Sequence, residues 1–231
     1  MALRPLVIVS LHASPVAALG AGENGGMNVY IRAVCEELSR RGIPTEVFTR
    51  RTSADGLDRV RLAEKSWVTR LAVGPADDID KAQLFDLLPD FTEALLREQR
   101  RRRADYGLIH SHYWLSGWVA TRLRDEWNLP WFHTFHTLAR VKNEQAAEGA
   151  VVEPEHRIAV EQAIVRNCDR LIASSTQEAD VGFGNEIWGD SEAPQPRNTA
   201  NAVPPITGDV GGCSLRAAAN PPTPSSRAKP E

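Results

Sequence analysis

Four histidines and several aromatic residues follow two short apolar runs of the sequence. One apolar run leads into residues 110–114 (HSHYW), and the next leads into residues 133–137 (HTFHT). Imidazole rings and hydroxyl groups donate and accept hydrogen bonds, so these residues could form a polar site for a small molecule. The alternative, that one or two of these histidines are hydrogen-bonded core residues, stays open.

A metal site is the other chemistry that clustered histidines suggest, because imidazole is a common metal ligand. Neither carboxylate nor cysteine stands among the four histidines. We also expect the rings of His110 and His112 to point to opposite faces of their strand. The sequence therefore predicts no metal site.

Residues 20–26 (GAGENGG) form a loop of small residues ahead of a predicted helix. Glycines let backbone N–H groups approach a ligand closely, and a helix start favours an anion. The loop contains the pattern G-x-G-x-x-G, but eight residues separate it from the preceding strand end at Leu11. Residues 49–50 (TR), at the end of the second strand, also lack the acidic side chain of a dinucleotide site. A nicotinamide-dependent oxidoreductase is therefore disfavoured, whereas a plain loop with a helix cap remains an alternative.

Two cations are suitably placed for a phosphate. Lys81 lies in a predicted loop among three aspartates, and Arg157 opens a predicted helix. Taken singly, each is typical of a solvated surface charge. The run Arg100–Arg103 matches a helix C-terminus, where basic residues are favoured by the dipole, and not a nucleic-acid patch.

The elements that must position these residues alternate between strand and helix. This alternation predicts an α/β fold with a Rossmann-like, doubly wound parallel sheet. In such a fold, ligands bind at the carboxyl ends of the strands. The apolar runs predict strands at residues 5–11, 45–49, 107–110, 131–134 and 170–173, and the helical spacing predicts helices at about 27–41, 84–103, 116–127 and 155–167.

The pattern changes near residue 181. Eight of the fifteen prolines fall in residues 181–231, and neither helical nor strand periodicity persists there. Such a segment buries too little apolar surface to offset its ordering entropy. We expect one domain over residues 1–180 and a disordered tail over residues 181–231.

Composition narrows the class of protein. The formal net charge of −3 gives no support to a nucleic-acid partner, and no apolar run approaches the length of a transmembrane segment. The N-terminus lacks the features of a secretory signal. Three cysteines without C-x-x-C spacing favour a reducing cytoplasm over a disulfide framework.

Four motifs together resemble a known family. They are residues 10–15 (SLHASP), 25–30 (GGMNVY), 110–117 (HSHYWLSG) and 133–138 (HTFHTL). In this order they resemble the N-terminal domain of the family 4 retaining glycosyltransferases, which include sucrose synthase, sucrose-phosphate synthase and, with the greatest likeness, the D-inositol-3-phosphate glycosyltransferases of mycothiol synthesis. The resemblance covers about residues 4–180. It implies a GT-B fold, in which an N-terminal domain binds the acceptor, a C-terminal domain binds most of the nucleotide-sugar, and neither metal nor cofactor is needed.

The resemblance also implies roles for individual residues. His12 and Asn28 would face an inositol acceptor, and Gly25 and Gly26 would lie against the donor diphosphate. His133 would approach the donor sugar as the catalytic residue. The phosphate of the acceptor would be held by Lys81, Tyr113, Thr137 and Arg157.

The sequence departs from the family in two places. Asn24 stands where the mycothiol enzymes usually carry aspartate, and no C-terminal donor domain is recognisable after residue 181. We therefore expect a domain that binds a small sugar or polyol phosphate, such as inositol 3-phosphate. It would bind a nucleotide-sugar of the UDP-GlcNAc type, and transfer its sugar, only if the missing domain is supplied. Two alternatives remain, a non-catalytic remnant or binding module and a transferase with a hexose acceptor.

Overall fold

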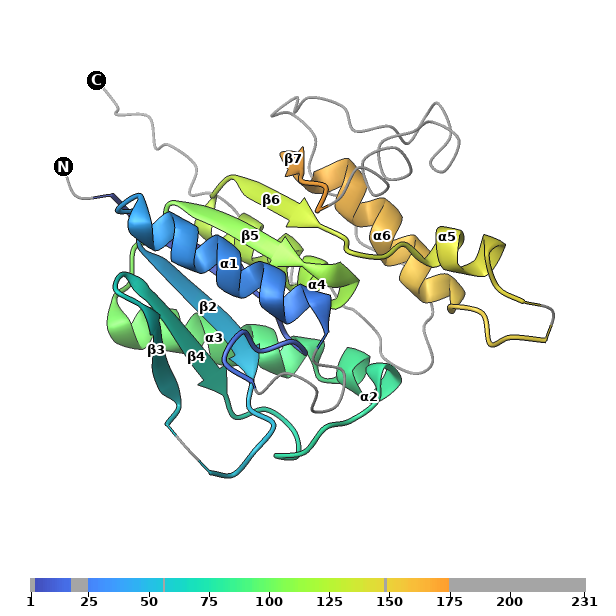
Figure 1. Ribbon diagram of the computed structural model, residues 1–231, viewed down its shortest axis with the longest axis horizontal. Coiled ribbons are helices and arrows are strands. Elements are labelled where there is room, and N and C mark those ends of the chain that lie inside the picture. The colour runs from blue at the N-terminus through green and yellow to red at the C-terminus, as the bar shows by residue number, and fades with distance from the viewer. Residues whose placement is uncertain (1–2, 18–24, 56, 148, 175–231) are drawn as a thin grey trace, which may run out of the picture. The chain divides into compact units, whose positions relative to one another are not determined.

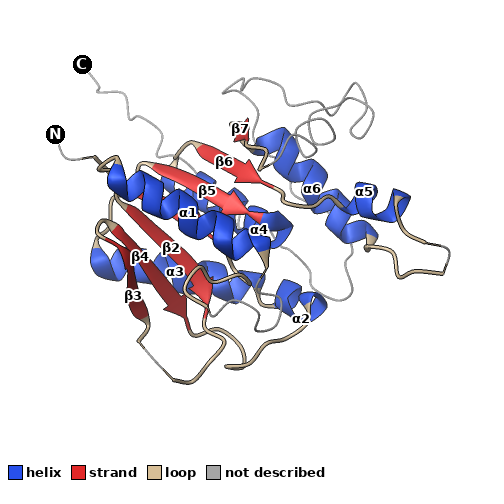
Figure 2. Cartoon of the chain, viewed as in Figure 1, coloured by secondary structure: helices blue, strands red, loops and turns tan. Residues whose placement is uncertain are grey.

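The computed structural model describes residues 3–17, 25–55, 57–147 and 149–174. The elements in chain order are β1 (Leu6–Val9), α1 (Gly26–Arg40), β2 (Thr45–Arg50), β3 (Arg59–Ala63), β4 (Ser66–Leu71), α2 (Lys81–Asp86), α3 (Leu88–Arg102), β5 (Leu108–His112), α4 (Tyr113–Trp127), β6 (Trp131–Thr134), α5 (Ala139–Glu144), α6 (Glu155–Asn167) and β7 (Arg170–Leu171) (Figures 1 and 2). The expected disordered tail, residues 181–231, lies outside the described residues.

The strands form one sheet in the order β3-β4-β2-β1-β5-β6-β7. All neighbours are parallel except β3, which pairs antiparallel with β4 at the edge. The expected Rossmann-like sheet is thus confirmed, with the correction that it is not wholly parallel. The sequence patterns did not predict the β3–β4 hairpin, because its strands carry arginine, threonine and tryptophan where a buried strand carries an apolar run.

Helices cover both faces of the sheet. In Figure 1, α1 crosses in front of the central strands, whereas α3 and α4 lie behind them. On the α1 face, Ile31 and Cys35 pack against Ile8 and its neighbours on β2 and β4. The larger core lies on the other face, where α3, α4 and α6 cover the sheet. Burial on both faces explains why the central strand β1 is a continuous apolar run.

The single helix expected over residues 84–103 is in fact two helices. Asp80 caps α2 through a reciprocal capping box with Gln83, and Pro89 stands in the first turn of α3. Proline is tolerated there but not in a helix interior, which explains the break after Asp86. Consequently Lys81 is the first residue of α2 and not a loop residue.

The start of α4 is a second correction. The helix begins at Tyr113, directly after β5, and not at Ser116 as the spacing predicted. Tyr113 and His136 both have positive φ, at 71° and 62°. A left-handed backbone is unusual for such side chains and costs energy, so both turns are strained where the strands end.

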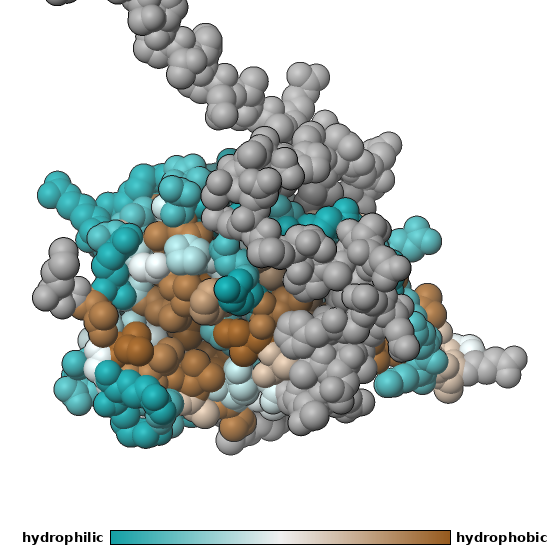
Figure 3. Space-filling view, turned by 90° about the horizontal axis from the view of Figure 1, so that it is seen from above, coloured by the Kyte–Doolittle hydropathy of each residue, from teal (hydrophilic) through white to brown (hydrophobic). Residues whose placement is uncertain are grey.

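Part of the protein surface is formed by hydrophobic residues. On the face shown in Figure 3, hydrophobic residues gather in a central area bordered by hydrophilic ones. Val29, in the first turns of α1, is about half exposed. Within the described ranges, no helix combines the length and apolar character needed to cross a membrane.

Candidate functional site

The site residues gather where the strand order reverses. β1 lies between β2 and β5, so the crevice at the carboxyl ends of β1 and β5 is the switch point at which α/β sheets bind ligands. His12 lies just beyond β1, Tyr113 follows β5, and Thr137 lies beyond β6. The amide of Leu11 donates to Ser116 Oγ on α4 at 3.0 Å, which fixes the end of β1 against that helix.

Tyr113 is the centre of the cluster. Its ring centroid lies 4.7 Å from that of His12 and 5.8 Å from the ammonium nitrogen of Lys81. The guanidinium of Arg157 lies 4.9 Å from the same ring and donates to the Tyr113 hydroxyl at 3.1 Å. Five of the expected acceptor residues, counting Thr137 through Arg157, are therefore linked by direct contacts.

Arg157 is fully buried, and each of its nitrogens is engaged. Nε donates to Glu161 at 2.7 Å, and Nη1 lies 2.8 Å from a carboxylate oxygen of Glu153. Nη2 donates to the carbonyl and the hydroxyl oxygen of Thr137 at 3.0 and 3.1 Å. The guanidinium thus orders both hydroxyl groups of the cluster, while two carboxylates compensate its charge.

The two carboxylates differ in environment. Burial raises the pKa of Glu161, and the nearby charge of Arg157 offsets only part of that rise. Burial acts in the same direction on Glu153, but hydrogen bonding to Lys142 and the charge of Arg157 outweigh it, so its pKa lies below the ordinary value. Glu153 is consequently ionised at neutral pH and lies at the accessible side of the pair.

The histidines of β5 share one face of the sheet. The ring centroids of His110 and His112 are 4.1 Å apart, so the expectation of opposite faces was wrong, because residues two apart on a strand point the same way. A hydrogen bond of 3.0 Å joins His112 Nδ1 and His136 Nε2, and another joins His110 Nε2 and Thr134 Oγ1. Burial lowers the pKa of His110 to about 4 and that of His112 well below its ordinary value, so both rings are neutral.

His133 lies on the opposite face, inside the core. It is fully buried, and its Nδ1 shares a hydrogen bond of 2.7 Å with Ser111 Oγ. Its Nε2 is buried and has no hydrogen-bond partner in the described part of the chain. His133 thus lies beneath α4, and the catalytic role expected for it stays a prediction.

His136 received no role from the sequence, although it directly precedes Thr137. It is partly exposed at the strained turn after β6. The ring of Tyr30, one turn into α1, packs against it with centroids 5.3 Å apart. Its position beside the start of α1 was therefore readable only from the structure.

The start of α1 is the remaining part of the site. Gly25 precedes the helix in an extended conformation and, as a glycine, has no side chain to cap the first turn. A Cβ added to Gly26 would meet no atom of the described residues within 4 Å. Asn28 is buried in the same turn. Residues 18–24 of the glycine loop lie outside the described residues.

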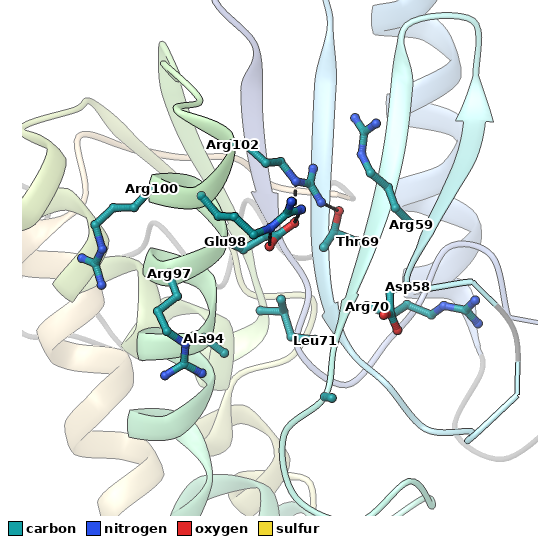
Figure 4. A pocket seen from close by; sticks show the side chains of 12 residues that line it. Asp58, Arg59, Thr69, Arg70, Leu71, Ala94, Arg97, Glu98, Arg100 and Arg102 are labelled. Atoms are coloured by element: carbon teal, nitrogen blue, oxygen red, sulfur yellow. Dashed lines mark hydrogen bonds and ion pairs between the residues drawn. The ribbon is translucent and has the colours of Figure 1, made fainter.

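A separate pocket of about 800 Å³ lies between β4 and α3 and is rich in arginine. Figure 4 shows Arg102 reaching across to Glu98 and Thr69, whereas Arg97, Arg100 and Arg70 point outward in different directions. Arg102 also pairs with the buried Glu46 at 2.8 Å. The centre of this pocket is an ion-pair network that joins α3 to the sheet, and its arginines do not converge on one ligand.

No three His, Cys, Asp or Glu side chains among the described residues are grouped so that they could hold a metal ion. The Tyr113 cluster combines an ammonium group, two hydroxyl groups and a charge-compensated guanidinium. Charge-assisted and hydroxyl donors of this kind suit a phosphate.

Comparisons with known proteins agree on one family. Residues 25–181 match the family described as Glycosyl transferase 4-like domain. The chain is 45% identical over 177 residues to the D-inositol 3-phosphate glycosyltransferase of Gordonia bronchialis, covering 76% of this chain and 39% of that protein. The enzyme of the same name from Thermobifida fusca is 43% identical over 175 residues, covering 75% and 40%.

Among solved structures, the sucrose-phosphate synthase of Thermosynechococcus elongatus is similar with a TM-score of 0.74 and 36% identity. That match covers 84% of this chain and 47% of the synthase. The chain therefore spans about two fifths of the length of the curated relatives and about half of the synthase.

Proposed function

This chain belongs to the glycosyl transferase 4-like family of GT-B glycosyltransferases, and from that premise we propose that its described domain binds the acceptor in a retaining sugar transfer. The proposed acceptor is a small phosphorylated polyol such as inositol 3-phosphate, and the proposed donor is a nucleotide-sugar of the UDP-GlcNAc type. The likeness to the D-inositol 3-phosphate glycosyltransferases supports this choice of acceptor.

The observation that carries the proposal is the cluster around Tyr113. A phosphate dianion needs charge-assisted donors, and Lys81 brings an ammonium group to 5.8 Å from the centroid of the Tyr113 ring. Thr137 is exposed, so its hydroxyl is accessible to a ligand. Arg157 lies beneath both hydroxyls and orders them. In this proposal the phosphate contacts Arg157 directly only after it displaces Glu153.

The remaining site residues fit around that phosphate. His12, stacked on Tyr113, would face the polyol ring together with Asn28. The open helix start at Gly25 and Gly26 would stabilise the leaving diphosphate as its charge develops. The partly exposed His136, after β6, is better placed to meet a donor sugar than the buried His133 within β6.

In the proposed reaction, an acceptor hydroxyl attacks the anomeric carbon from the side on which the diphosphate leaves. The new bond joins the acceptor oxygen to that carbon, and the bond from the carbon to the diphosphate oxygen breaks. The acceptor proton passes to a diphosphate oxygen. A second domain would hold the nucleotide and close the cleft, so that both substrates are held in attack geometry.

Titration calorimetry with the purified chain tests the acceptor. We expect inositol 3-phosphate to bind and unphosphorylated inositol to bind much more weakly. Lys81→Ala and Thr137→Val should each weaken phosphate binding, by about 1.5–3 kcal/mol for the charged donor and about 0.5–1.5 kcal/mol for the hydroxyl. Lys65→Ala, which removes an exposed lysine elsewhere, is the matched control.

Three results would change the assignment. Equal affinity for inositol and inositol 3-phosphate would remove the basis for a phosphorylated acceptor. Tighter binding of fructose 6-phosphate than of inositol 3-phosphate would favour the hexose acceptor that the likeness to sucrose-phosphate synthase suggests. Binding of neither would favour a non-catalytic module.

A further inference from the structure

Lys81 depends on a weakly structured segment for its position. α2 has only six residues, and isolated helices of that length are unstable in water. The stretch that connects β4 to α2 is mostly exposed and follows the end of the sheet (Figure 1). Contacts of this segment with the rest of the domain must therefore fix the place from which Lys81 reaches Tyr113.

Arg50, the last residue of β2, holds this segment. Its guanidinium donates from Nη1 to the carbonyl oxygen of Pro75 at 2.5 Å and from Nη2 to that of Asp77 at 2.5 Å. Arg50 itself is 3% exposed. Its side chain thus joins the rigid end of a central strand to two points of the chain just before α2.

The backbone of Arg50 is tied to the other side of the site. Its amide donates to the carbonyl oxygen of Leu11 at 2.9 Å, and the Thr49 hydroxyl donates to the same oxygen at 3.3 Å. Leu11 directly precedes His12. One residue therefore sets the relative positions of the strand end that carries His12 and the segment that carries Lys81.

Burying this guanidinium is costly. Burial lowers the pKa of Arg50, and the charges of Asp78 and Asp77 offset part of that effect. All of its described hydrogen bonds go to backbone carbonyl oxygens and none to a carboxylate. A buried cation used in this way contributes mainly to the geometry of the backbone that it holds.

The two ends of the segment are fixed independently. Gly74 has a φ of +65°, and a Cβ there would lie 2.5 Å from Leu87 Cδ1, so the chain turns tightly against the α2–α3 junction. On α2, Phe85 packs against Trp114 with ring centroids 5.4 Å apart and against His156 at 4.9 Å. Arg50 supplies a further restraint between Gly74 and α2, on the backbone of Pro75 and Asp77.

We infer that Arg50 is a positioning residue for the acceptor phosphate, acting through Lys81 by clamping the Pro75–Asp77 backbone. This rests on the proposed function for its consequence in binding, but not for the clamp itself. Arg50 touches no substrate in this assignment, and its loss should act only on interactions that Lys81 makes.

The first test uses the ligand-free chain. Arg50→Lys keeps the positive charge, but its single ammonium group cannot reproduce the fork that bridges both carbonyls. Hydrogen exchange should become faster across residues 75–84 and stay unchanged in α4 and α6. Arg51→Lys, at the neighbouring half-buried arginine, should leave the exchange of residues 75–84 unchanged. Unaltered exchange in Arg50→Lys would overturn the clamp, whatever the chain binds.

The second test is a double-mutant cycle with inositol 3-phosphate in the titration calorimeter. Arg50→Lys should raise the Kd about tenfold. In the Lys81→Ala background it should cause no further increase, because the residue through which it acts is gone. An equal increase in both backgrounds would show that Arg50 does not act through Lys81.

Gly74→Ala gives an independent route if Arg50→Lys folds poorly. It disturbs the same segment at the residue before Pro75 and should show the same faster exchange and the same dependence on Lys81. Unchanged hydrogen exchange across residues 75–84 in both variants would contradict the inference. If the unaltered chain binds no inositol 3-phosphate, the proposed function fails, while the exchange experiment still decides the clamp.

Discussion

At the scale of single residues, the most informative group is Arg157 with its two carboxylates. Glu161 is 1% exposed at its side chain, whereas Glu153 is 19% exposed and also pairs with Lys142. Glu161 is thus a permanent counter-ion and Glu153 an exchangeable one. The spacing of four residues between Glu153, Arg157 and Glu161 was visible in the sequence, but their burial as a triad was not, because it depends on Tyr113 and Thr137 from other elements.

Glu153→Gln should therefore have opposite effects with and without ligand. Without ligand, the loss of one counter-charge should lower stability by about 1–3 kcal/mol, or roughly 2–4 °C in Tm per kcal/mol for a domain of this size. With inositol 3-phosphate, the rise in Tm should be larger than in the unaltered chain, because the phosphate no longer competes with a carboxylate. Scanning fluorimetry measures both, with the exposed Glu155→Gln as control. A smaller ligand-induced rise would contradict the exchangeable role.

His133, within β6, and His136, just after it, should respond differently to removal. His133→Ala empties a fully buried position and should cost about 2–4 kcal/mol of unfolding free energy. His136→Ala removes a partly exposed ring and should cost about 1 kcal/mol or less. Urea unfolding of both variants separates these outcomes, and equal losses would show that His136 is as much a core residue as His133.

The neutral histidines predict how stability depends on pH. Burial lowers the pKa of His110 from 6.5 to about 4. Between these two pH values His110 is therefore protonated in the unfolded chain and neutral in the folded chain. The stability that depends on a neutral His110 is fully present above pH 6.5. As the pH falls toward 4, the free energy of unfolding decreases by up to about 1.4 kcal/mol per pH unit for each such histidine. Urea unfolding at several pH values checks the slope. His110→Asn should reduce it, and an unchanged slope would show that another group titrates.

At the scale of elements, the sequence predicted β1, β2, β5, β6 and β7 but missed β3 and β4. β1 is a continuous apolar run, and β2, β5 and β6 each contain two adjacent apolar residues, which is a property of the chain itself. The β3–β4 hairpin was missed because its identity depends on pairing with β2, a long-range contact that leaves no local pattern. Likewise the site could be located at the strand ends from sequence, but not the faces of its histidines or the clamp on Pro75, which depend on packing.

The contact between α4 and α6 depends on a glycine. A Cβ at Gly117 would lie 2.3 Å from Ile164 Cδ1 and 2.9 Å from His133 Cε1. Gly117→Ala should therefore destabilise the domain by about 1–3 kcal/mol through overpacking. Gly26→Ala is the matched control, because open space surrounds that position and alanine favours a helix. Chemical denaturation that ranks the two variants equally would mean that α6 moves aside freely.

At the scale of the whole molecule, the chain matches about two fifths of its curated relatives' length. Under the proposed function, the described domain offers one wall of a cleft and the helix start at Gly25. Nothing among the described residues is assigned to the nucleotide.

We therefore expect no sugar transfer when the purified chain is incubated with a radiolabelled UDP-sugar and inositol 3-phosphate. A chimera that joins residues 1–174 to the C-terminal half of the Gordonia bronchialis relative should restore transfer, because both substrates are then held together. His136→Ala in that chimera should lower the rate more than Lys65→Ala does. Transfer by the chain alone, above the background of heat-treated protein, would contradict the proposal that a second domain is needed to bind the donor.

The left-handed backbone at Tyr113 and His136 has a consequence for laboratory evolution. Each position costs about 1–3 kcal/mol that glycine, and to a lesser degree asparagine, would recover. A library selected only for resistance to heat or protease should accumulate glycine or asparagine at these two positions. A library selected for retention of a phosphorylated ligand should keep the tyrosine. Deep sequencing of the two populations would therefore reveal, position by position, where a less stable residue is kept because it binds the ligand.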